Sequence, residues 1–566
     1  MRLVSSILVA VGVLTAACDQ QTSLVVEGGS VLTLDGAASS SRAVSIAGDR
    51  VASLSDSSSG ERLQIAGGVI MPALVDHHIH LLNVGLWLQN DREGGRLFLD
   101  VSGARSLEAV TAVVRERTAG GAAGRWVTGA GWSQGSWGDE ALPTSDPLDA
   151  ASAAHPVFLA RTDGHAGWVN LAALAAAGIS STTADPEGGR IVRDEAGRPT
   201  GVLLERANEI VTPLLPQPTD AQVIEAFHLA ADALAARGVV EVEDAGVLTP
   251  PGVVALNEDF GRYLDLLRRA DAEQPLAVRV NLMIPAPSVL ADALLASDHR
   301  WQISPRIRIT HLKLFSDGAL GSRGAALTHA YADDPSSSGV LRMTTDEIAT
   351  LSRRALDAGL DVATHAIGDE AIRQTLDAYE TLLVERPSLE PRRLRVEHFS
   401  YAREEDFARA ARLGVVLSIQ SNFNADPDDP ASLGALRAGV ENESRVYAWR
   451  RLHAMGARLV EGSDYFARLR EPFAGYRDAL TLRHALGDGG LDGVVRRDGI
   501  AMQVLRLVPG GAFEPGVIRV GGQADLIVVD GDPLSVPPEA LSTLRVLATI
   551  NAGRITYRAS TDAVRN

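Results

Sequence analysis

The sequence predicts an α/β protein: a (β/α)8 barrel with a large insertion after its first strand, plus a small β-sandwich built from both chain ends. Eight short apolar runs between residues 69 and 461 have the length of buried parallel strands, with segments of helical periodicity between the later ones. A gap of about 160 residues follows the first run, far more than one helix and its loops need. Both chain ends instead contain short apolar runs separated by Gly, Asp and Pro turns.

Length and composition agree with this architecture. A chain of 566 residues can form a large barrel with a smaller companion domain. With 46% hydrophobic and 22% charged residues, it can bury a large core. A formal net charge of −18 argues against a nucleic-acid partner, because phosphate backbones would be repelled.

Residues 1–18 have the features of a signal peptide. Arg2 precedes a mostly apolar stretch of about 15 residues, which is short for a membrane span but suits a signal-peptide core. Cys18, the only cysteine, follows small residues and resembles the lipobox cysteine of bacterial lipoproteins. We expect export as a cell-envelope lipoprotein, with a lipid anchor on the membrane surface. The alternative is an ordinary cleaved signal with an incidental cysteine, and a periplasmic or secreted protein.

Residues 19–70 and 506–560 are predicted to form one composite β-sandwich. The first part contains strand-like runs at 23–26, 30–34 and 43–46. The second part contains similar runs at 516–520, 524–529 and 546–550, again with turn residues between them.

Residues 71–505 are predicted to form a metal-binding barrel, with an insertion at about 84–220. An insertion after a barrel strand lies over the active-site mouth, where it can act as a lid or specificity cap. Helical periodicity is clearest at 345–360 and 370–385. The expected strands are 69–74, 239–242, 278–283, 308–314, 361–365, 394–398, 415–419 and 458–461.

A histidine pair at the end of the first run suggests a metal site. In Asp76-His77-His78-Ile79-His80, residues two apart in a strand face the same way, so His78 and His80 project together. Two such imidazoles can hold a divalent metal, although an isolated pair is also typical of hydrogen-bonded structural histidines. Further candidate ligands stand at the ends of strands four, five, six and eight, which share one end of a parallel barrel: Lys313, His365, His398 and Asp464.

These motifs resemble the amidohydrolase superfamily, and specifically its amidohydrolase-3 branch, the YtcJ-like hydrolases that include N-substituted formamide deformylase. Asp76-x-His78-x-His80 matches the first metal motif of the superfamily. The resemblance covers about residues 24–558 in the right order. The branch motifs are Trp126-Val127-Thr128-Gly129-Ala130-Gly131-Trp132 with Trp137, Arg161-Thr162-Asp163-Gly164-His165 with Asn170, Lys313-x-Phe315-x-Asp317-Gly318-Ala319-Leu320-Gly321-Ser322-Arg323, His365-Ala366-Ile367-Gly368-Asp369, Glu397-His398 and Gly462-Ser463-Asp464.

The resemblance implies one or two divalent ions, commonly zinc, that activate a water molecule. It implies that His78, His80 and Asp464 hold one ion, while His365 and His398 hold a second or orient the substrate. Asp464 also has the position of the general base, which passes a proton from the water to the leaving amine.

Lys313 has three open roles. A protonated lysine repels a dication, so near a metal it must be neutral or modified. Resemblance to binuclear members implies a carboxylated Lys313 that bridges two ions. The alternatives are a salt bridge with Asp317 or Glu397, or direct binding of the substrate.

Four further residues are candidates for substrate binding. By resemblance, Asp163 and His165 belong to a substrate-region motif in the insertion. Trp132 can form an apolar wall of the site or pack within the cap. Arg323 can neutralise an acidic substrate group or form a structural ion pair.

We therefore expect a metal-dependent amidohydrolase that hydrolyses a non-peptide C–N bond of a small molecule, in an amide, formamide or cyclic amide. The alternatives are a lactonase or esterase, because the same hydroxide attacks any activated acyl group, and a solute-binding lipoprotein without turnover. A homodimer is compatible with such barrels.

Overall fold

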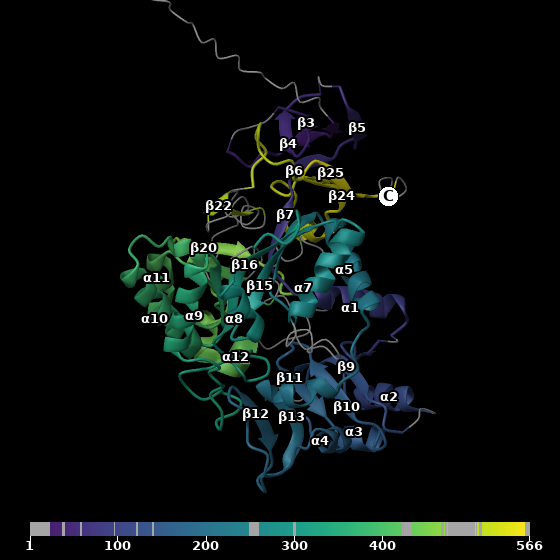
Figure 1. Ribbon diagram of the computed structural model, residues 1–566, viewed down its shortest axis with the longest axis vertical. Helices are drawn as coiled ribbons and strands as arrows, with labels where there is room; N and C mark the ends of the chain where they lie inside the picture. The colour runs from purple at the N-terminus through teal and green to yellow at the C-terminus, as the bar shows by residue number, and fades with distance from the viewer. Residues whose placement is uncertain are drawn as a thin grey trace, which may run out of the picture.

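The computed structural model arranges three sheet-based parts along one long axis (Figure 1). The sandwich of strands from both chain ends lies at the top, the barrel in the middle and the inserted sheet at the bottom. Cys18 and the predicted signal peptide lie outside the described residues. The structure describes residues 23–560, apart from 37–39, 57–58, 96, 120–122, 139–140, 248–259, 298–300, 421–422, 424–432, 466–468, 470–472, 474–503, 505, 509–511 and 515.

The middle part is an eight-stranded parallel sheet, in the order β20-β19-β18-β17-β16-β15-β14-β7. Two backbone hydrogen bonds join its ends: Asp464 N–H donates to His78 O (2.6 Å), and His80 N–H donates to Tyr465 O (3.0 Å). The predicted fold class is confirmed. The strands are β7 (Leu74–Ile79), β14 (Val239–Asp244), β15 (Arg279–Pro285), β16 (Ile307–Phe315), β17 (Asp361–Ala366), β18 (Leu394–His398), β19 (Val416–Ile419) and β20 (Arg458–Glu461).

The predicted bounds of the first barrel strand, 69–74, are wrong. The apolar run contains two strands, β6 (Val69–Pro72) in the sandwich and β7 in the barrel. The change of sheet falls at Ala73, whose N–H donates to Asp525 O (3.1 Å), while Leu74 N–H donates to Gly238 O (2.9 Å). Both strands are buried on both faces, so the hydrophobic pattern contains no break between them.

The sandwich consists of a four-stranded and a five-stranded sheet, and apolar side chains from both chain ends share its core. The expected strand at 516–520 is wrong: Ile518 N–H donates to Thr33 O (3.0 Å) outside any regular ladder. The strands are β1 (Leu24–Glu27), β2 (Ser30–Val31), β3 (Ala43–Ala47), β4 (Arg50–Ser53), β5 (Glu61–Gln64), β6, β23 (Leu526–Val529), β24 (Val546–Asn551) and β25 (Arg554–Arg558). A separate hairpin joins β21 (Arg506–Val508) to β22 (Ala512–Glu514).

The inserted sheet has six strands in the order β12-β13-β11-β10-β9-β8. In the chain it lies between α1 (Leu81–Arg92) and α5 (Asp220–Ala235). These two helices pack directly on each other, and the absence of a side chain at Gly85 allows this, since a methyl group there would overlap Ala226 O. Its elements are β8 (Leu99–Asp100), α2 (Leu107–Thr118), β9 (Val127–Trp132), α3 (Asp146–Ala151), β10 (Val157–Arg161), β11 (Ala166–Val169), α4 (Leu171–Ala176), β12 (Gly189–Arg193) and β13 (Pro199–Glu205).

Two barrel helices, α8 (Val289–Leu295) and α9 (Thr345–Asp357), begin at side-chain caps, Ser288 and Thr344. Thr344 and Glu347 form a capping box at the start of α9, which together with α10 confirms the two periodic segments. From α7 onward, the described helices of the barrel are α7 (Phe260–Glu273), α8 (Val289–Leu295), α9 (Thr345–Asp357), α10 (Asp369–Glu385), α11 (Glu404–Leu413), α12 (Leu433–Ala438) and α13 (Trp449–Ala454).

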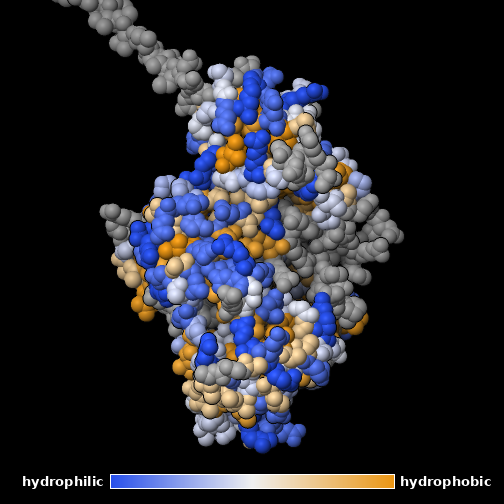
Figure 2. All heavy atoms as spheres, turned by 90° about the vertical axis from the view of Figure 1, so that its right-hand side faces the viewer, coloured by the Kyte–Doolittle hydropathy of each residue, from blue (hydrophilic) through white to orange (hydrophobic). Residues whose placement is uncertain are grey.

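The surface in Figure 2 mixes hydrophilic and hydrophobic residues over all three parts. Within the described part of the chain, every helix is too short or too polar to cross a bilayer.

Candidate metal centre

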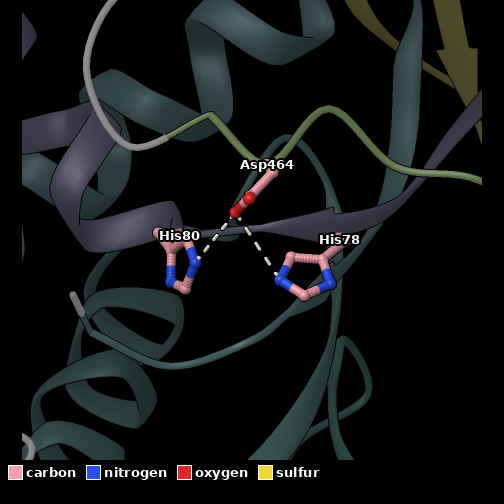
Figure 3. A group of neighbouring side chains, drawn as sticks. All are labelled: His78, His80 and Asp464. Carbon is pink, nitrogen blue, oxygen red and sulfur yellow. Dashed lines mark ion pairs between the residues drawn. The ribbon is translucent and has the colours of Figure 1, made fainter. Parts of the chain in front are cut away.

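Three side chains at the closing seam of the barrel form the tightest group of potential metal ligands: His78, His80 and Asp464. Asp464 Oδ1 lies 3.1 Å from His80 Nε2 and 3.6 Å from His78 Nε2. Figure 3 shows His78 on β7, His80 between the end of β7 and the start of α1, and Asp464 on the neighbouring loop, with all three side chains directed toward one another. The potential ligand atoms lie within 4.8 Å of one another, which one divalent ion can span.

The other nitrogen of each histidine is already held. His78 Nδ1 lies 2.5 Å from Glu397 Oε2, and His80 Nδ1 lies 2.8 Å from Gly246 O. A proton on Nδ1 satisfies both acceptors and leaves each Nε2 lone pair for a metal. Carboxylate and backbone partners of this kind orient metal-binding histidines and increase their basicity.

The carboxylate behind His78 is itself fixed by a buried guanidinium. Arg395 is paired with both Glu397 and Glu243, and its Nη2 donates to His77 O (3.0 Å). Arg395, Glu243 and Glu397 are almost fully buried within the barrel. Arg395 therefore connects β18, β14 and β7 directly behind the metal centre.

Asp76 fixes the loop that carries Asp464. Its carboxylate accepts Ser463 N–H (2.9 Å) and His78 N–H (3.2 Å) and pairs with Ser463 Oγ. Burial raises the pKa of Asp76 to about 6, although these hydrogen bonds act against the increase. The next residue after Ser463 adopts a positive φ of 50°, so this turn is held in a left-handed conformation at the ligand.

The surroundings of Asp464 favour its charged form. Burial acts to raise its pKa, but the imidazoles of His78, His80 and His398 around it hold the pKa well below the usual value. A charged carboxylate beside two imidazoles is the composition expected of a site for a divalent cation.

His365 and His398 lie beside this group at the ends of β17 and β18. Their ring centroids are 4.5 Å apart, and His398 lies 4.9 Å from the ring of His78. His398 Nδ1 lies 2.8 Å from Gln420 Oε1 and 3.8 Å from Asp464 Oδ2, whereas His365 Nε2 lies 3.3 Å from Gly318 O. They are adjacent to the first group and can serve a second ion or the substrate.

Burial keeps these imidazoles neutral. It lowers the pKa of His398 to about 3 and that of His365 well below its usual value, and nearby cationic groups act in the same direction on His365. The pKa of His78 is also lowered, by burial first and by Lys313 second. Neutral imidazole is the form that binds metals.

Lys313 points into the same group, with Nζ 3.5 Å from His78 Nε2. Burial lowers the pKa of Lys313 to about 8, against the opposing effect of Glu397 and Asp464. Among the described residues it forms no salt bridge with Glu397 or Asp317, so that alternative is not supported. Asp317 instead accepts the N–H of Ile367 (3.0 Å), next to the His365 strand end.

The inserted sheet brings His165 to the barrel. The His165 ring lies 5.4 Å from that of His365, and its Nδ1 lies 2.9 Å from Glu205 Oε2. Burial acts to lower the pKa of His165, but Glu205 and Asp163 together raise it, and the net shift is upward. Asp163 accepts His165 N–H (3.1 Å) and pairs with Arg161 Nη1 at 2.5 Å.

The other two predicted substrate contacts, Trp132 and Arg323, are buried and have partners within the protein. Trp132 is fully buried in the core of the inserted sheet, where its Nε1 donates to Leu159 O (2.8 Å). It packs against Trp137 and Trp168, so it belongs to the cap core. Arg323 is also buried, and it pairs with Asp333. Both residues therefore have the surroundings that the structural alternatives describe, and their substrate contact stays a prediction.

Several supporting residues escaped sequence reasoning: Arg395, Glu243, Gln420 and Glu205. Gln420 directly follows a predicted strand, so its position at the barrel rim was a usable signal. Arg395 and Glu243 lie inside strands, and only a parallel barrel turns their side chains toward one another. The sequence around Glu205 did not indicate a role at the site, because its contact with the barrel depends on how the inserted sheet packs against it.

The residues present fit a divalent cation: two imidazoles that are held through Nδ1, a carboxylate and a lysine with a lowered pKa converge at one end of a parallel barrel. This fold and donor set define a metal-dependent hydrolase.

The chain belongs to the amidohydrolase family, whose profile (Amidohydro_3) matches residues 65–557. It is 29% identical over 518 residues to YtcJ of Bacillus subtilis (strain 168), named as an amidohydrolase, covering 88% of this chain and 91% of that protein. It is 26% identical over 571 residues to N-substituted formamide deformylase of Arthrobacter pascens, covering 95% and 99%. An uncharacterized metal-dependent hydrolase from Pyrococcus horikoshii has a similar structure, with a TM-score of 0.66, 26% identity and coverage of 91% and 99%.

Proposed function

We propose that the protein hydrolyses a non-peptide C–N bond of a small-molecule amide, formamide or cyclic amide with a metal-activated water. The observation that carries this proposal is the convergence of His78 Nε2, His80 Nε2 and Asp464 Oδ1, with each histidine fixed through Nδ1. The relationship to N-substituted formamide deformylase supports C–N chemistry.

When bound by His78, His80 and Asp464, a divalent ion would acidify water and polarise the substrate carbonyl. Asp464 accepts a proton as the water oxygen attacks the carbonyl carbon, and it passes this proton to the leaving nitrogen as the C–N bond breaks. The products are a carboxylic acid and an amine. His365 and His398 orient the substrate or hold a second ion.

For Lys313 we propose carboxylation: the neutral Nζ attacks the carbon of carbon dioxide, an N–C bond forms and one proton is released to solvent. The resulting carbamate would be the bridging ligand when two zinc ions are bound. Only a neutral amine can attack carbon dioxide, and a pKa lowered to about 8 makes this form accessible near neutral pH. Native mass spectrometry tests this with the full protein in excess zinc and bicarbonate. Two ions and one added carbon dioxide per chain are expected, whereas a single ion that excess zinc does not change contradicts the bridge.

The substrate class can be tested by metal analysis combined with an activity screen of N-formyl amines, N-acyl amines and cyclic amides. We expect turnover that a chelator removes and added zinc restores. Absence of turnover by fully metal-loaded protein contradicts C–N hydrolysis. Faster hydrolysis of lactones or esters in the same screen would assign the site to those acyl groups instead.

We also propose export and a lipid anchor at Cys18. The support is the sequence pattern of residues 1–18 alone. Expression in a bacterium with labelled fatty acid should label the wild type and leave Cys18→Ser unlabelled. Equal labelling of both proteins would contradict the anchor. Sedimentation of the protein without residues 1–18 would test the expected homodimer.

A further inference from the structure

Glu205 makes a buried connection between the inserted sheet and the barrel. It is the last residue of β13, and its side chain is 1% exposed. Its Oε2 accepts a hydrogen bond from His165 Nδ1 (2.9 Å) and lies 3.5 Å from Arg342 Nη1. Glu205 N–H also donates to His165 O (2.9 Å). Side-chain and backbone bonds together fix His165 relative to Glu205.

The barrel loop after β16 is shaped to admit this carboxylate. A methyl group on Gly318 or Gly324 would overlap Glu205 Oε1. Gly318 O lies 3.3 Å from His365 Nε2, so the surface that receives Glu205 also contacts a histidine of the site. Among the residues that the structure describes, Glu205 Oε1 has no hydrogen-bond partner. The polar partners of this carboxylate are therefore His165 and Arg342, both at Oε2.

Glu205 also adopts a backbone conformation that is unfavourable for a residue with a side chain. Its φ is 51° and its ψ is −127°, outside the helical and strand regions. Such a conformation costs free energy and persists where surrounding contacts require it. Here it marks the point at which β13 turns into the loop that meets the barrel.

We propose that Glu205 is a positioning residue for the reaction: it fixes the inserted-sheet His165 beside His365, with Nε2 available to the substrate. This inference rests on the proposed function and extends it, because it makes the inserted sheet part of the active site. A carboxylate that accepts from Nδ1 sets the tautomer and ring orientation of an imidazole, and the opposite nitrogen, Nε2, then faces away from Glu205. The side chain of His165 is 10% exposed, so it can be reached from the site.

A double-mutant cycle with metal-loaded, full-length protein tests the coupling. Glu205→Ala should lower kcat/KM by about 10- to 100-fold, the effect of losing one hydrogen bond between an imidazole and a charged group. Glu205→Gln, which keeps an acceptor of the same shape, should lose less. In a His165→Ala background, Glu205→Ala should cause little additional loss. The matched control is Glu209→Gln, an exposed partner of Arg206, which should behave like the wild type.

A loss of equal size in both backgrounds would overturn the proposal, because Glu205 would then act independently of His165. Metal content is measured for every variant and should not change. If Glu205→Ala fails to fold, Glu205→Gln serves in the same cycle.

A spectroscopic readout separates this inference from the proposed function. In protein with nitrogen-labelled histidine, at a pH above the raised pKa of His165, the wild-type His165 should show the tautomer with its proton on Nδ1. Glu205→Gln should shift both ring-nitrogen signals. Unchanged His165 signals in Glu205→Gln contradict the positioning role. No amide turnover by metal-loaded wild type, with the expected shift present, contradicts the proposed function and leaves the positioning role supported.

Discussion

The barrel and the inserted sheet hold their polar site residues in different ways. In the barrel, His78 is 1% exposed and is supported by Glu397 and then by Arg395, all of them on parallel strands of one sheet. In the inserted sheet, the side chains of His165 and Asp163 are 10% and 19% exposed. They rely on partners within the insertion, and they meet the barrel at the loop after β16 and at His365 of β17.

This difference suggests a division of labour. Side chains held by successive buried charges are preorganised, as a metal centre requires. Side chains on a separate sheet can differ between relatives without disturbing the ions, as substrate selection requires. Substitutions in the barrel should therefore change metal affinity and chemistry, and substitutions in the inserted sheet should change substrate use or local stability.

The largest effect is expected from Asp464→Asn, which removes the base from the barrel side. An amide cannot accept the proton of the attacking water, so turnover should decrease by about 1,000-fold or more. Amide hydrolysis by metal-saturated protein measures this. The exposed Asp265 provides the control Asp265→Asn. Retention of most of the activity would exclude Asp464 as the base.

Trp132→Ala tests the inserted sheet. Trp132 is fully buried between Trp137 and Trp168, so its truncation should lower the free energy of unfolding of this sheet by about 3 kcal/mol. Thermal unfolding and limited proteolysis measure the loss, and zinc affinity should stay unchanged. Trp126→Ala, at a partly buried position, should cost less. A raised KM with an unchanged free energy of unfolding would instead support the prediction that Trp132 contacts the substrate.

Lys313 should make the stability of the metal-free barrel depend on pH. Burial lowers its pKa from 10.5 to about 8, so the unfolded chain binds more protons than the folded protein between these values. Stability should therefore rise as pH increases from about 8 to 10.5, and the gain is lost as pH falls back through 8. The gain is at most about 3 kcal/mol. Denaturant unfolding at several pH values measures this gain, and Lys313→Met should abolish it. If the free energy of unfolding depends on pH in the same way in both proteins, the lowered pKa of Lys313 is contradicted.

A smaller effect is expected from Glu397→Gln, which leaves the ligands in place. The amide weakens the hydrogen bond to His78 Nδ1, and Arg395 loses one of its two carboxylate partners. Zinc affinity should therefore fall by about 10- to 100-fold. Competition with a chelator measures this. The control is Glu385→Gln. Glu385 at the end of α10 forms a surface ion pair with Arg353 of α9, and its substitution should have no effect on zinc affinity. Equal zinc affinities for the wild type, Glu397→Gln and Glu385→Gln would show that Glu397 does not support His78 as a metal ligand.

Much of the barrel side was predictable because parallel strands present their carboxyl ends at one edge. A polar residue directly after a buried run is then placed by local pattern alone, and His78, His80, Lys313, His365, His398 and Asp464 do lie together. The split of the first run into β6 and β7 was not predictable, since both strands are buried and equally apolar.

The inserted side was less predictable. Trp132 and Arg323 match family motifs, yet each is enclosed by its own neighbourhood: a tryptophan cluster for one and Asp333 for the other. Motif membership did not distinguish a residue that contacts substrate from one that supports the fold, because burial depends on elements distant in the chain.

The amino-acid sequence alone determined the fold class, the composite sandwich and the set of potential metal ligands, because hydrophobic periodicity and strand-end positions are local properties. Only the tertiary structure decided which nitrogen of each histidine is free, that burial brings the pKa of Lys313 to about 8, and that Glu205 meets the barrel at Gly318. These depend on distances between strands and sheets separated by up to several hundred residues, and such distances are set by packing.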